Sequence, residues 1–315
     1  MTSMNATQNA NGSLVSRQTW LNTRKLAKNL VQRRSWLLTF FLLDIVIIYG
    51  IITDPILTET WQYIVPGIAA TIQVTIVAFV FAIVIALFTA FGRVSKNIFI
   101  YNLSTFYVEL FRGLPLLVIV LIFAFVVTPG IITFVTGVRS ADSAVPAEPA
   151  IPLLDDLLQR LLGVPESQIA TTVIRTRDIE PIWRIMFAFA LTYGAFLSEV
   201  FRAGIESVGK GQLEAARSLG MTYVQAMRYI ILPQAIRNVL PDLANNFVFL
   251  LKDTSLASVV AVPEISYLAR QYSSNRFRYP EGLLVLSLIY ANLTIVLSLG
   301  AYYLETRLHA DRHAA

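Results

Sequence analysis

The chain of 315 residues contains 56% hydrophobic and 14% charged residues, and its mean hydropathy is +0.62. A soluble domain carries about 25% charged residues, whereas several runs here approach the roughly 20 apolar residues that span a bilayer. The composition therefore indicates a polytopic helical membrane protein and excludes an outer-membrane barrel, whose strands alternate in polarity. The chain has no cysteine, which excludes disulfides and thiol chemistry, and its net charge of +5 bears on orientation in the membrane rather than on nucleic acid.

Residues 1–35 are polar and basic and contain no acidic residue, so we expect a cytoplasmic N-terminal segment. A membrane domain follows over residues 36–308, and residues 309–315 form a short tail. The expected fold class is all-α. The apolar runs predict about six transmembrane helices, over residues 36–52, 67–91, 103–127, 182–201, 239–262 and 282–304. Gly113 and Pro115 are predicted to interrupt or bend the third of these.

Polar connections separate these spans. The longest covers residues 128–181 and is predicted to be an external insertion. An even number of spans puts both termini on one side, and most Lys and Arg residues between the spans gather on that side, together with residues 204–237. The positive-inside rule therefore predicts cytoplasmic termini and a cytoplasmic 204–237 loop. Three arginines between residues 263 and 281 are an exception, because this topology puts them on the external side of the membrane. The shorter connections are residues 54–62, 92–102 and 263–281.

The segment at residues 214–233, EAARSLGMTYVQAMRYIILP, is the most polar long stretch between two apolar ones. Its first half is rich in helix formers, and Gly220 stands where a helix C-terminus favours a left-handed residue. Thr222 and Gln225 match a capping box that starts a second helix, and Pro233 ends or kinks that helix. These features predict a helix–turn–helix. At helical spacing, the apolar face of the second helix comprises Tyr223, Ala226, Met227 and Ile230.

The spacing of Glu-Ala-Ala, Gly220 and the Ile-x-Leu-Pro ending resembles the signature loop of the membrane permease subunits of ABC importers. In that family the loop lies in the cytoplasm and docks into a groove on the ATPase subunit. We call residues 214–233 the signature loop. Periodicity alone fits an ordinary amphipathic surface loop equally well. By the resemblance, the residues that couple transport to ATP hydrolysis are Glu214, Ala215, Ala216, Arg217, Gly220, Ile230, Leu232 and Pro233.

Two further runs, YVELFRGLPLL at residues 107–117 and LLKDTSLASVVAVPEI at residues 250–265, resemble the polar amino acid branch of these permeases, the histidine/glutamine type. With the signature loop, the resemblance covers most of residues 66–308. It implies the ABC type I importer permease fold. The 128–181 interval is longer than the usual connection in the family, and the N-terminal lead is variable there.

Two pairs of charged residues interrupt the apolar spans with the same spacing. Glu109 and Arg112 lie three residues apart, as do Glu199 and Arg202, so each pair shares a helix face. Charges inside a span are costly unless they face a bundle interior or a cavity. Each pair either neutralises itself and fixes the end of its helix, or belongs to a cytoplasmic gate.

Lys252 and Asp253 are adjacent in the fifth span, so on a regular helix they point in different directions. Transporters use locally unwound helices at mid-membrane to coordinate substrate groups, and an amino acid brings both a carboxylate and an ammonium group. We therefore expect a break here that lines a substrate path, with interhelical packing as the alternative. The candidate path residues are Asn246, Lys252, Asp253, Thr254 and Ser255.

Residues 204–210 read G-x-x-x-x-G-K and mimic a phosphate-binding loop. Gly211 follows where that motif needs Ser or Thr for magnesium, and a membrane span precedes it instead of a strand. Because His309 and His313 are the only histidines and cysteine is absent, we predict no metal site. The chain is thus not expected to be an enzyme or to bind a cofactor, and ATP and magnesium belong to a partner.

These patterns predict a multi-pass permease of the cell inner (plasma) membrane that imports polar amino acids. The resemblance implies two ATPase subunits, a second permease subunit that is the same or a homologous chain, and an external binding protein, in a lipid membrane and without nucleic acid. The alternatives are an ion-gradient-driven secondary transporter, in which the signature loop has no obvious role, and a membrane scaffold or sensor, which leaves Lys252 and Asp253 unexplained. The sequence does not identify the amino acid.

Overall fold

The computed structural model describes residues 35–131 and 179–310, and these residues form helices without strands. The chain divides into two compact units, Met1–Trp61 and Gln62–Ala315, each of which is described by itself. The N-terminal segment, most of the predicted insertion and the last five residues lie outside the described part, so the predictions made for them stay predictions.

The first unit contains α2 (Ser35–Thr53) and the start of α3 (Pro55–Ile64). The Asp54 carboxylate accepts a hydrogen bond from the Ile56 amide at 2.8 Å, and Pro55 occupies the first position of the helix. This start signal makes residues 55–64 helical. The connection predicted at residues 54–62 is therefore mostly helical.

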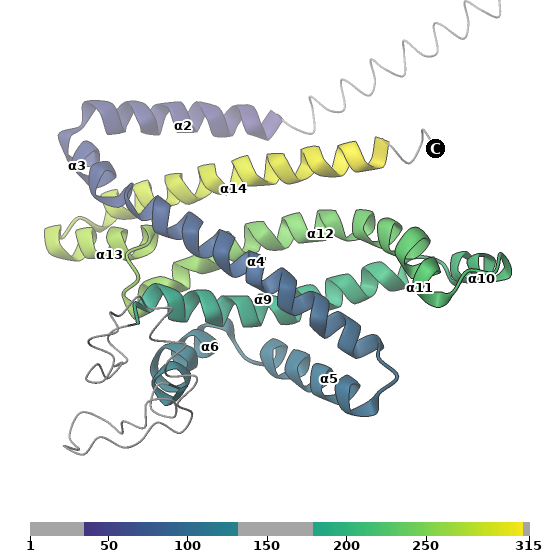
Figure 1. The fold of residues 1–315 in the computed structure, drawn as a ribbon. Helices are drawn as coiled ribbons and strands as arrows, with labels where there is room; N and C mark the ends of the chain where they lie inside the picture. The colour runs from purple at the N-terminus through teal and green to yellow at the C-terminus, as the bar shows by residue number, and fades with distance from the viewer. Residues whose placement is uncertain (1–34, 132–178, 311–315) are drawn as a thin grey trace, which may run out of the picture. The chain divides into compact units, whose positions relative to one another are not determined.

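In the second unit, α4 and α9 pack along each other, and α12 packs on α9 and α14 (Figure 1). The α10 and α11 helices project from the end where α9 and α12 meet (Figure 1). The elements in chain order are α4 (Gly67–Val94), α5 (Ile98–Gly113), α6 (Leu116–Ile122), the π-helix η1 (Phe123–Val127), α9 (Pro181–Glu206), α10 (Lys210–Ser218), α11 (Tyr223–Ala226), the π-helix η4 (Met227–Ile231), α12 (Leu232–Asp253), the 3₁₀-helix η5 (Thr254–Val260), α13 (Ile265–Arg276) and α14 (Tyr279–Ala310).

The core lies where α4 meets α9. A row of fully buried alanines on α4, Ala78, Ala82 and Ala86, recurs every fourth residue and so lines one face of the helix. Ala188 and Phe189 of α9 belong to the same buried cluster. Small residues let helix backbones approach closely, which is how helices associate where lipid removes the hydrophobic driving force.

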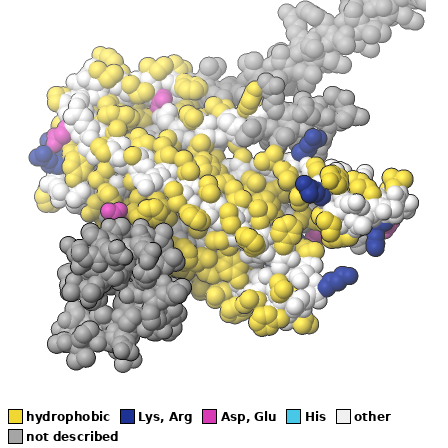
Figure 2. Space-filling model, in the orientation of Figure 1, with side chains coloured by type: hydrophobic (Ala, Val, Ile, Leu, Met, Phe, Trp, Pro, Cys, Tyr) yellow, Lys and Arg dark blue, Asp and Glu magenta, His cyan; other side chains and the backbone are white. Residues whose placement is uncertain are grey.

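The opposite face of α4 exposes large apolar side chains, among them Phe81 and Phe88. In Figure 2, hydrophobic side chains cover much of the face shown over α4, α9 and α12. An apolar surface of this extent on a helical protein is typical of contact with lipid. The structure thus confirms a helical membrane protein.

Three helices of the described residues are long and apolar enough to cross a membrane: Pro55–Val94, Pro181–Glu206 and Tyr279–Tyr303. A fourth crossing is possible if Ile98–Gly113 and Leu116–Ile131, which are bent by 107°, form one span. That bend confirms the break predicted at Gly113 and Pro115, because Pro115 immediately precedes α6. A count of six is compatible with these helices and stays a prediction.

The fifth predicted span differs most from expectation. The α12 helix begins at Leu232 and ends at Asp253, where the chain tightens into η5 and does not unwind. Beyond it, the predicted polar connection contains α13, whose first amides donate to the Glu264 carboxylate at 2.7 and 2.9 Å. This helix was not predicted, because its N-cap is a glutamate, which is a weaker start signal than Ser, Thr, Asp or Asn.

Candidate functional site

The turn in the middle of the signature loop is set by Gly220. Its φ of 81° lies in the left-handed region, which residues with a Cβ adopt only at a cost. The amide of Gly220 donates to the Arg217 carbonyl, and the Met221 amide donates to the Ala216 carbonyl at 3.1 Å. This pair of bonds is a Schellman motif and confirms the predicted helix end at Gly220.

A capping box starts the next helix. The Thr222 hydroxyl accepts from the Gln225 amide at 3.3 Å, and the Gln225 side-chain oxygen accepts from the Thr222 amide at 2.9 Å. Two amides that would otherwise lack partners are satisfied reciprocally. The predicted helix–turn–helix is therefore confirmed, with α10 before the turn and α11 after it.

The underside of the signature loop is apolar and packs on the chain that flanks it. Met227 and Ile230 pack against buried Ile231 and Ala235, and Ala226 is fully buried. The same cluster holds Val208, with Ile205 and Leu213 at its edge. Tyr223, which helical spacing puts on the same face, lies at the start of α11 and is 48% exposed.

The outer surface of the loop presents apolar side chains to solvent. Leu219 is 82% exposed and Val224 is 71% exposed, and Tyr223 and Tyr229 lie among the exposed residues as well. Four large apolar side chains are thus exposed on a polar, projecting segment. Glu214 and Arg217 are exposed on the same segment and supply charge beside it.

The predicted coupling residues divide between the two surfaces. Ala216 is buried, while Ile230 and Leu232 are half-buried and lie against the chain itself. Those three positions therefore shape the loop, while the rest are open to a partner. The exposed members are Glu214, Ala215, Arg217, Gly220 and Pro233.

Pro233 does not end the helical path, so that part of its prediction is wrong. It lies in the first turn of α12, directly after the π-helix η4. A π turn changes the hydrogen-bond register, and a proline is tolerated in the first turn because its missing N–H has no partner to lose there. The helical path from α11 into α12 is consequently continuous, with a change of register at the base of the loop.

The base of the signature loop is packed tightly between α9 and α12. A Cβ added to Gly204 would lie 2.0 Å from the Val239 side chain, so only glycine permits this approach. The Asn238 amide group donates to the Ser207 hydroxyl at 2.8 Å across the same junction. The ends of α9 and α12 are therefore held against each other where the signature loop joins them.

A cluster of ions, which we call the Glu199 hub, lies at the loop end of α9. Glu199 accepts hydrogen bonds from Arg93 at the end of α4, from Arg112 at the end of α5 at 3.2 Å, and from Arg202 on its own helix at 2.8 Å. Arg202 also binds Glu206 at 2.8 Å. One carboxylate thus ties three helix ends together.

This arrangement corrects one predicted pair and confirms the other. Glu199 and Arg202 do pair, as expected. Arg112 instead reaches across to Glu199, and Glu109 is exposed away from the hub. Because Arg112 lies in the last turn of α5, its side chain can extend past its own helix toward α9. Arg93 was missed, since its only sequence signal is a charge at the end of an apolar run.

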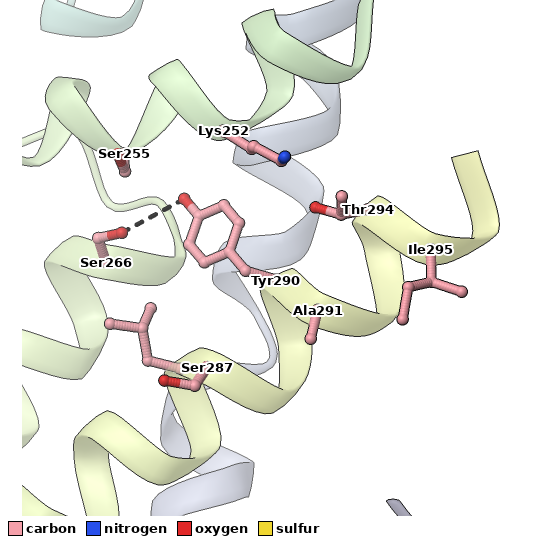
Figure 3. A pocket seen from close by; sticks show the side chains of 9 residues that line it. Lys252, Ser255, Ser266, Ser287, Tyr290, Ala291, Thr294 and Ile295 are labelled. Carbon is pink, nitrogen blue, oxygen red and sulfur yellow. Dashed lines mark hydrogen bonds between the residues drawn. The ribbon is translucent and has the colours of Figure 1, made fainter. Parts of the chain in front are cut away.

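An open cavity of about 650 Å³ lies between the end of α12 and α14. Figure 3 shows Lys252 reaching from α12 toward Thr294 of α14, with Ser255 on η5 and Ser266 on α13. Ligand pockets for small molecules span about 300–1,000 Å³, so an amino acid fits. Of the predicted path residues, Lys252 and Ser255 line this cavity.

The other three predicted path residues face elsewhere. Asp253 accepts a hydrogen bond from the Tyr193 hydroxyl of α9 at 2.7 Å. Thr254 is fully buried and donates to the Leu251 carbonyl, while the Asn246 amide donates to the Asp242 carbonyl on its own helix. Lys252 and Asp253 do point apart as adjacent residues must, and they serve different surfaces.

Glu264 supports one wall of the cavity from behind. It is fully buried, caps α13 and accepts a hydrogen bond from the Tyr290 hydroxyl at 2.9 Å. Burial raises the pKa of the Glu264 carboxyl, against the lowering effect of the amides of Ser266 and Tyr267. Its oxygens are thus occupied by the protein. No sequence pattern pointed to this residue.

The residues that mimic a phosphate-binding loop run from the last turn of α9 into the start of α10. They follow a helix, whereas the motif requires a preceding strand. This segment is the base of the signature loop.

The sequence model of the family described as binding-protein-dependent transport system inner membrane component matches residues 82–310. The chain is similar to the probable glutamine ABC transporter permease protein GlnM of Bacillus subtilis strain 168, with 34% identity over 80% of this chain and 96% of the relative. It is also 31% identical to the L-cystine transport system permease protein TcyB of the same organism, over 83% of this chain and 92% of that one.

Two solved structures resemble the fold. A crystal structure described as an amino acid ABC transporter with histidines matches 79% of this chain and 96% of its own, with a TM-score of 0.60 and 28% identity. The MetNI methionine ABC transporter in an inward-facing conformation matches 81% of this chain and 99% of its own, with a TM-score of 0.56. At 15% identity the second likeness concerns the fold alone.

Proposed function

Because this chain belongs to the family of binding-protein-dependent transport system inner membrane components, the permeases of ABC importers, we propose that it imports polar amino acids and couples to a separate ATPase through its signature loop. The loop geometry carries this proposal. A rigid turn fixed by Gly220 and the Thr222 capping box projects exposed apolar side chains, and its base is packed between α9 and α12.

In this proposal two ATPase subunits close on ATP and push the signature loops of two permease subunits. The second subunit is a copy of this chain or a homologous chain. The tight junction at Gly204 and Val239 passes the displacement to α9 and α12, so the helices rock between inward-open and outward-open states. Arg217, exposed beside the apolar surface, pairs with an acidic residue of the ATPase.

The substrate path runs past the Lys252 cavity, where Lys252 and Ser255 meet α14 (Figure 3). An external binding protein delivers the amino acid. The termini and the signature loop lie in the cytoplasm, which also places the Glu199 hub at the cytoplasmic end. In this proposal the hub is a cytoplasmic gate, because its ion pairs hold the ends of α4, α5 and α9 together. Names of similar permeases support the substrate class, since they refer to glutamine and L-cystine.

The test is ATP hydrolysis by material purified through a tag on this chain, after co-expression with its neighbouring genes. The preparation is assayed with and without a binding protein and single polar amino acids. We expect ATPase activity that one amino acid stimulates. A preparation without ATPase, in which uptake follows an ion gradient, would instead identify a secondary transporter.

A further inference from the structure

The Lys252 cavity has an uneven distribution of charge. Among the described residues that line it, Lys252 is the one charged side chain. The remaining polar groups are hydroxyls, contributed by Ser255, Ser266, Ser287, Tyr290 and Thr294. A ligand in this cavity therefore meets one cation and several neutral groups that can donate or accept.

Two acidic groups that adjoin lining residues, Asp253 beside Lys252 and Glu264 bonded to Tyr290, are already engaged. Asp253 turns to α9, where it accepts from the Tyr193 hydroxyl at 2.7 Å. Glu264 is fully buried and accepts from the amides of Ser266 and Tyr267 and from the Tyr290 hydroxyl. Neither carboxylate lines the cavity, so neither can pair directly with a positive charge placed there.

Hydrogen bonds within the protein orient two of these hydroxyl groups, those of Tyr290 and Ser266. Tyr290 donates its proton to Glu264 and accepts from the Ser266 hydroxyl at 3.3 Å, as the dashed line in Figure 3 shows. Figure 3 shows the Tyr290 ring beside the open space into which Lys252 reaches. Tyr290 lines the cavity and Glu264 does not, and the Tyr290 hydroxyl already occupies one Glu264 oxygen.

We propose that the Lys252 cavity determines specificity and takes amino acids with neutral or acidic side chains, rejecting those with basic side chains. This inference rests on the proposed function. The α-carboxylate of any amino acid can bind Lys252, and its ammonium group can donate to hydroxyls. Among the described residues that line the cavity, a second positive charge on the substrate finds no acidic partner and faces Lys252, and such like-charge juxtaposition opposes binding strongly.

The experiment measures the cavity apart from the binding protein. The tag-purified permease–ATPase complex, without binding protein, is titrated with radiolabelled glutamine and glutamate, and arginine and lysine are tested as competitors. We expect glutamine and glutamate to bind, with arginine and lysine weaker by about tenfold or more. Equal binding of arginine and glutamine by the unmodified complex would overturn the inference.

Substitutions at Lys252 test the cause. Lys252→Met weakens binding of glutamate and glutamine by about tenfold, Lys252→Arg retains it, and Lys252→Glu reverses the ranking in favour of arginine and lysine. Lys96→Met, at an exposed lysine between α4 and α5, is the matched control and leaves binding unchanged. A Lys252→Glu complex that keeps the original ranking contradicts the assignment.

The outcomes separate this inference from its premise. Absence of ATPase from the preparation overturns the proposed function and the inference with it. A preparation with amino-acid-stimulated ATPase that binds none of the four amino acids, or binds basic ones equally well, overturns only the role of the cavity.

Discussion

The signature loop and the Glu199 hub lie at the same end of α9 but are stabilised by contacts of opposite kinds. The loop is held by hydrogen bonds between residues three to five positions apart, at Gly220 and at Thr222. The hub joins Glu199 to Arg93 and Arg112, which are 106 and 87 residues away along the chain. One region depends on local sequence and the other on assembly of the membrane domain.

The difference has a mechanical consequence. A loop that keeps its own shape can transmit a push without deforming, because its hydrogen bonds do not depend on the helices that move. The hub is sensitive to those helices, since α4, α5 and α9 must all be in place for Glu199 to keep its three partners. Glu199 precedes Ser207, at the base of the loop, by about two helical turns. In the proposed mechanism, movement of the loop is passed along this part of α9 to the hub.

The largest effect is expected from Glu199→Gln, which leaves three arginines without their shared anion. Removing one partner of a buried ion pair costs about 3–5 kcal/mol. Because the side chains of Arg112 and Glu199 are 43% and 20% exposed, we expect a smaller loss, about 2–3 kcal/mol. Thermal unfolding of the purified complex, followed by size-exclusion chromatography, measures it.

Glu206→Gln is the matched control, because it makes the same chemical change in a carboxylate that shares Arg202 with Glu199. The Glu206 side chain is 60% exposed and contacts only Arg202 within the hub, so the loss is below about 1 kcal/mol. Equal destabilisation by the two variants would show that Glu199 does not join the helices.

What the sequence could predict follows the same division. The turn at Gly220, the Thr222 capping box and the break at Pro115 were all recognisable, because each depends on residues within a few positions of one another. The long apolar helices were equally visible, since lipid requires continuous apolar runs. Local rules predicted these features correctly.

The hub and the cavity needed the structure. Glu109–Arg112 and Glu199–Arg202 have identical spacing, yet only the second pair forms, because Arg112 finds a better anion on another helix. Asp253 was assigned to the substrate path, but its carboxylate instead accepts a hydrogen bond from Tyr193 of α9, 60 residues earlier in the chain. Spacing gives the direction of a side chain and does not identify its partner.

The next effect in size is expected from Gly220→Val in the signature loop. A β-branched residue in the left-handed conformation costs about 1–2 kcal/mol, and no neighbouring atom lies within 4 Å of the added Cβ, so the strain is confined to the backbone. We expect folded complex with ATPase activity that no longer drives uptake. Uptake and hydrolysis are compared in proteoliposomes.

Gly211→Val serves as its control within the same loop region. Gly211 lies in α10, has ordinary helical geometry and also has open space around it, so valine is accommodated without strain. Unchanged uptake in Gly220→Val would contradict a fixed turn as the coupling element.

The smallest effect is expected from Thr222→Ala, which removes one half of the capping box. Loss of an N-cap costs about 1 kcal/mol, which corresponds to roughly a fivefold change in a local opening equilibrium. Hydrogen exchange should therefore speed up about fivefold at the start of α11, while Thr222→Ser, which keeps the hydroxyl acceptor, restores protection.

In Thr222→Ala, hydrogen exchange in α4 and α5 should not change, whereas Glu199→Gln should raise hydrogen exchange at the ends of both helices. If Thr222→Ala also raised exchange near Arg93 and Arg112, the loop would not be stabilised locally, and the contrast between the two regions would fail.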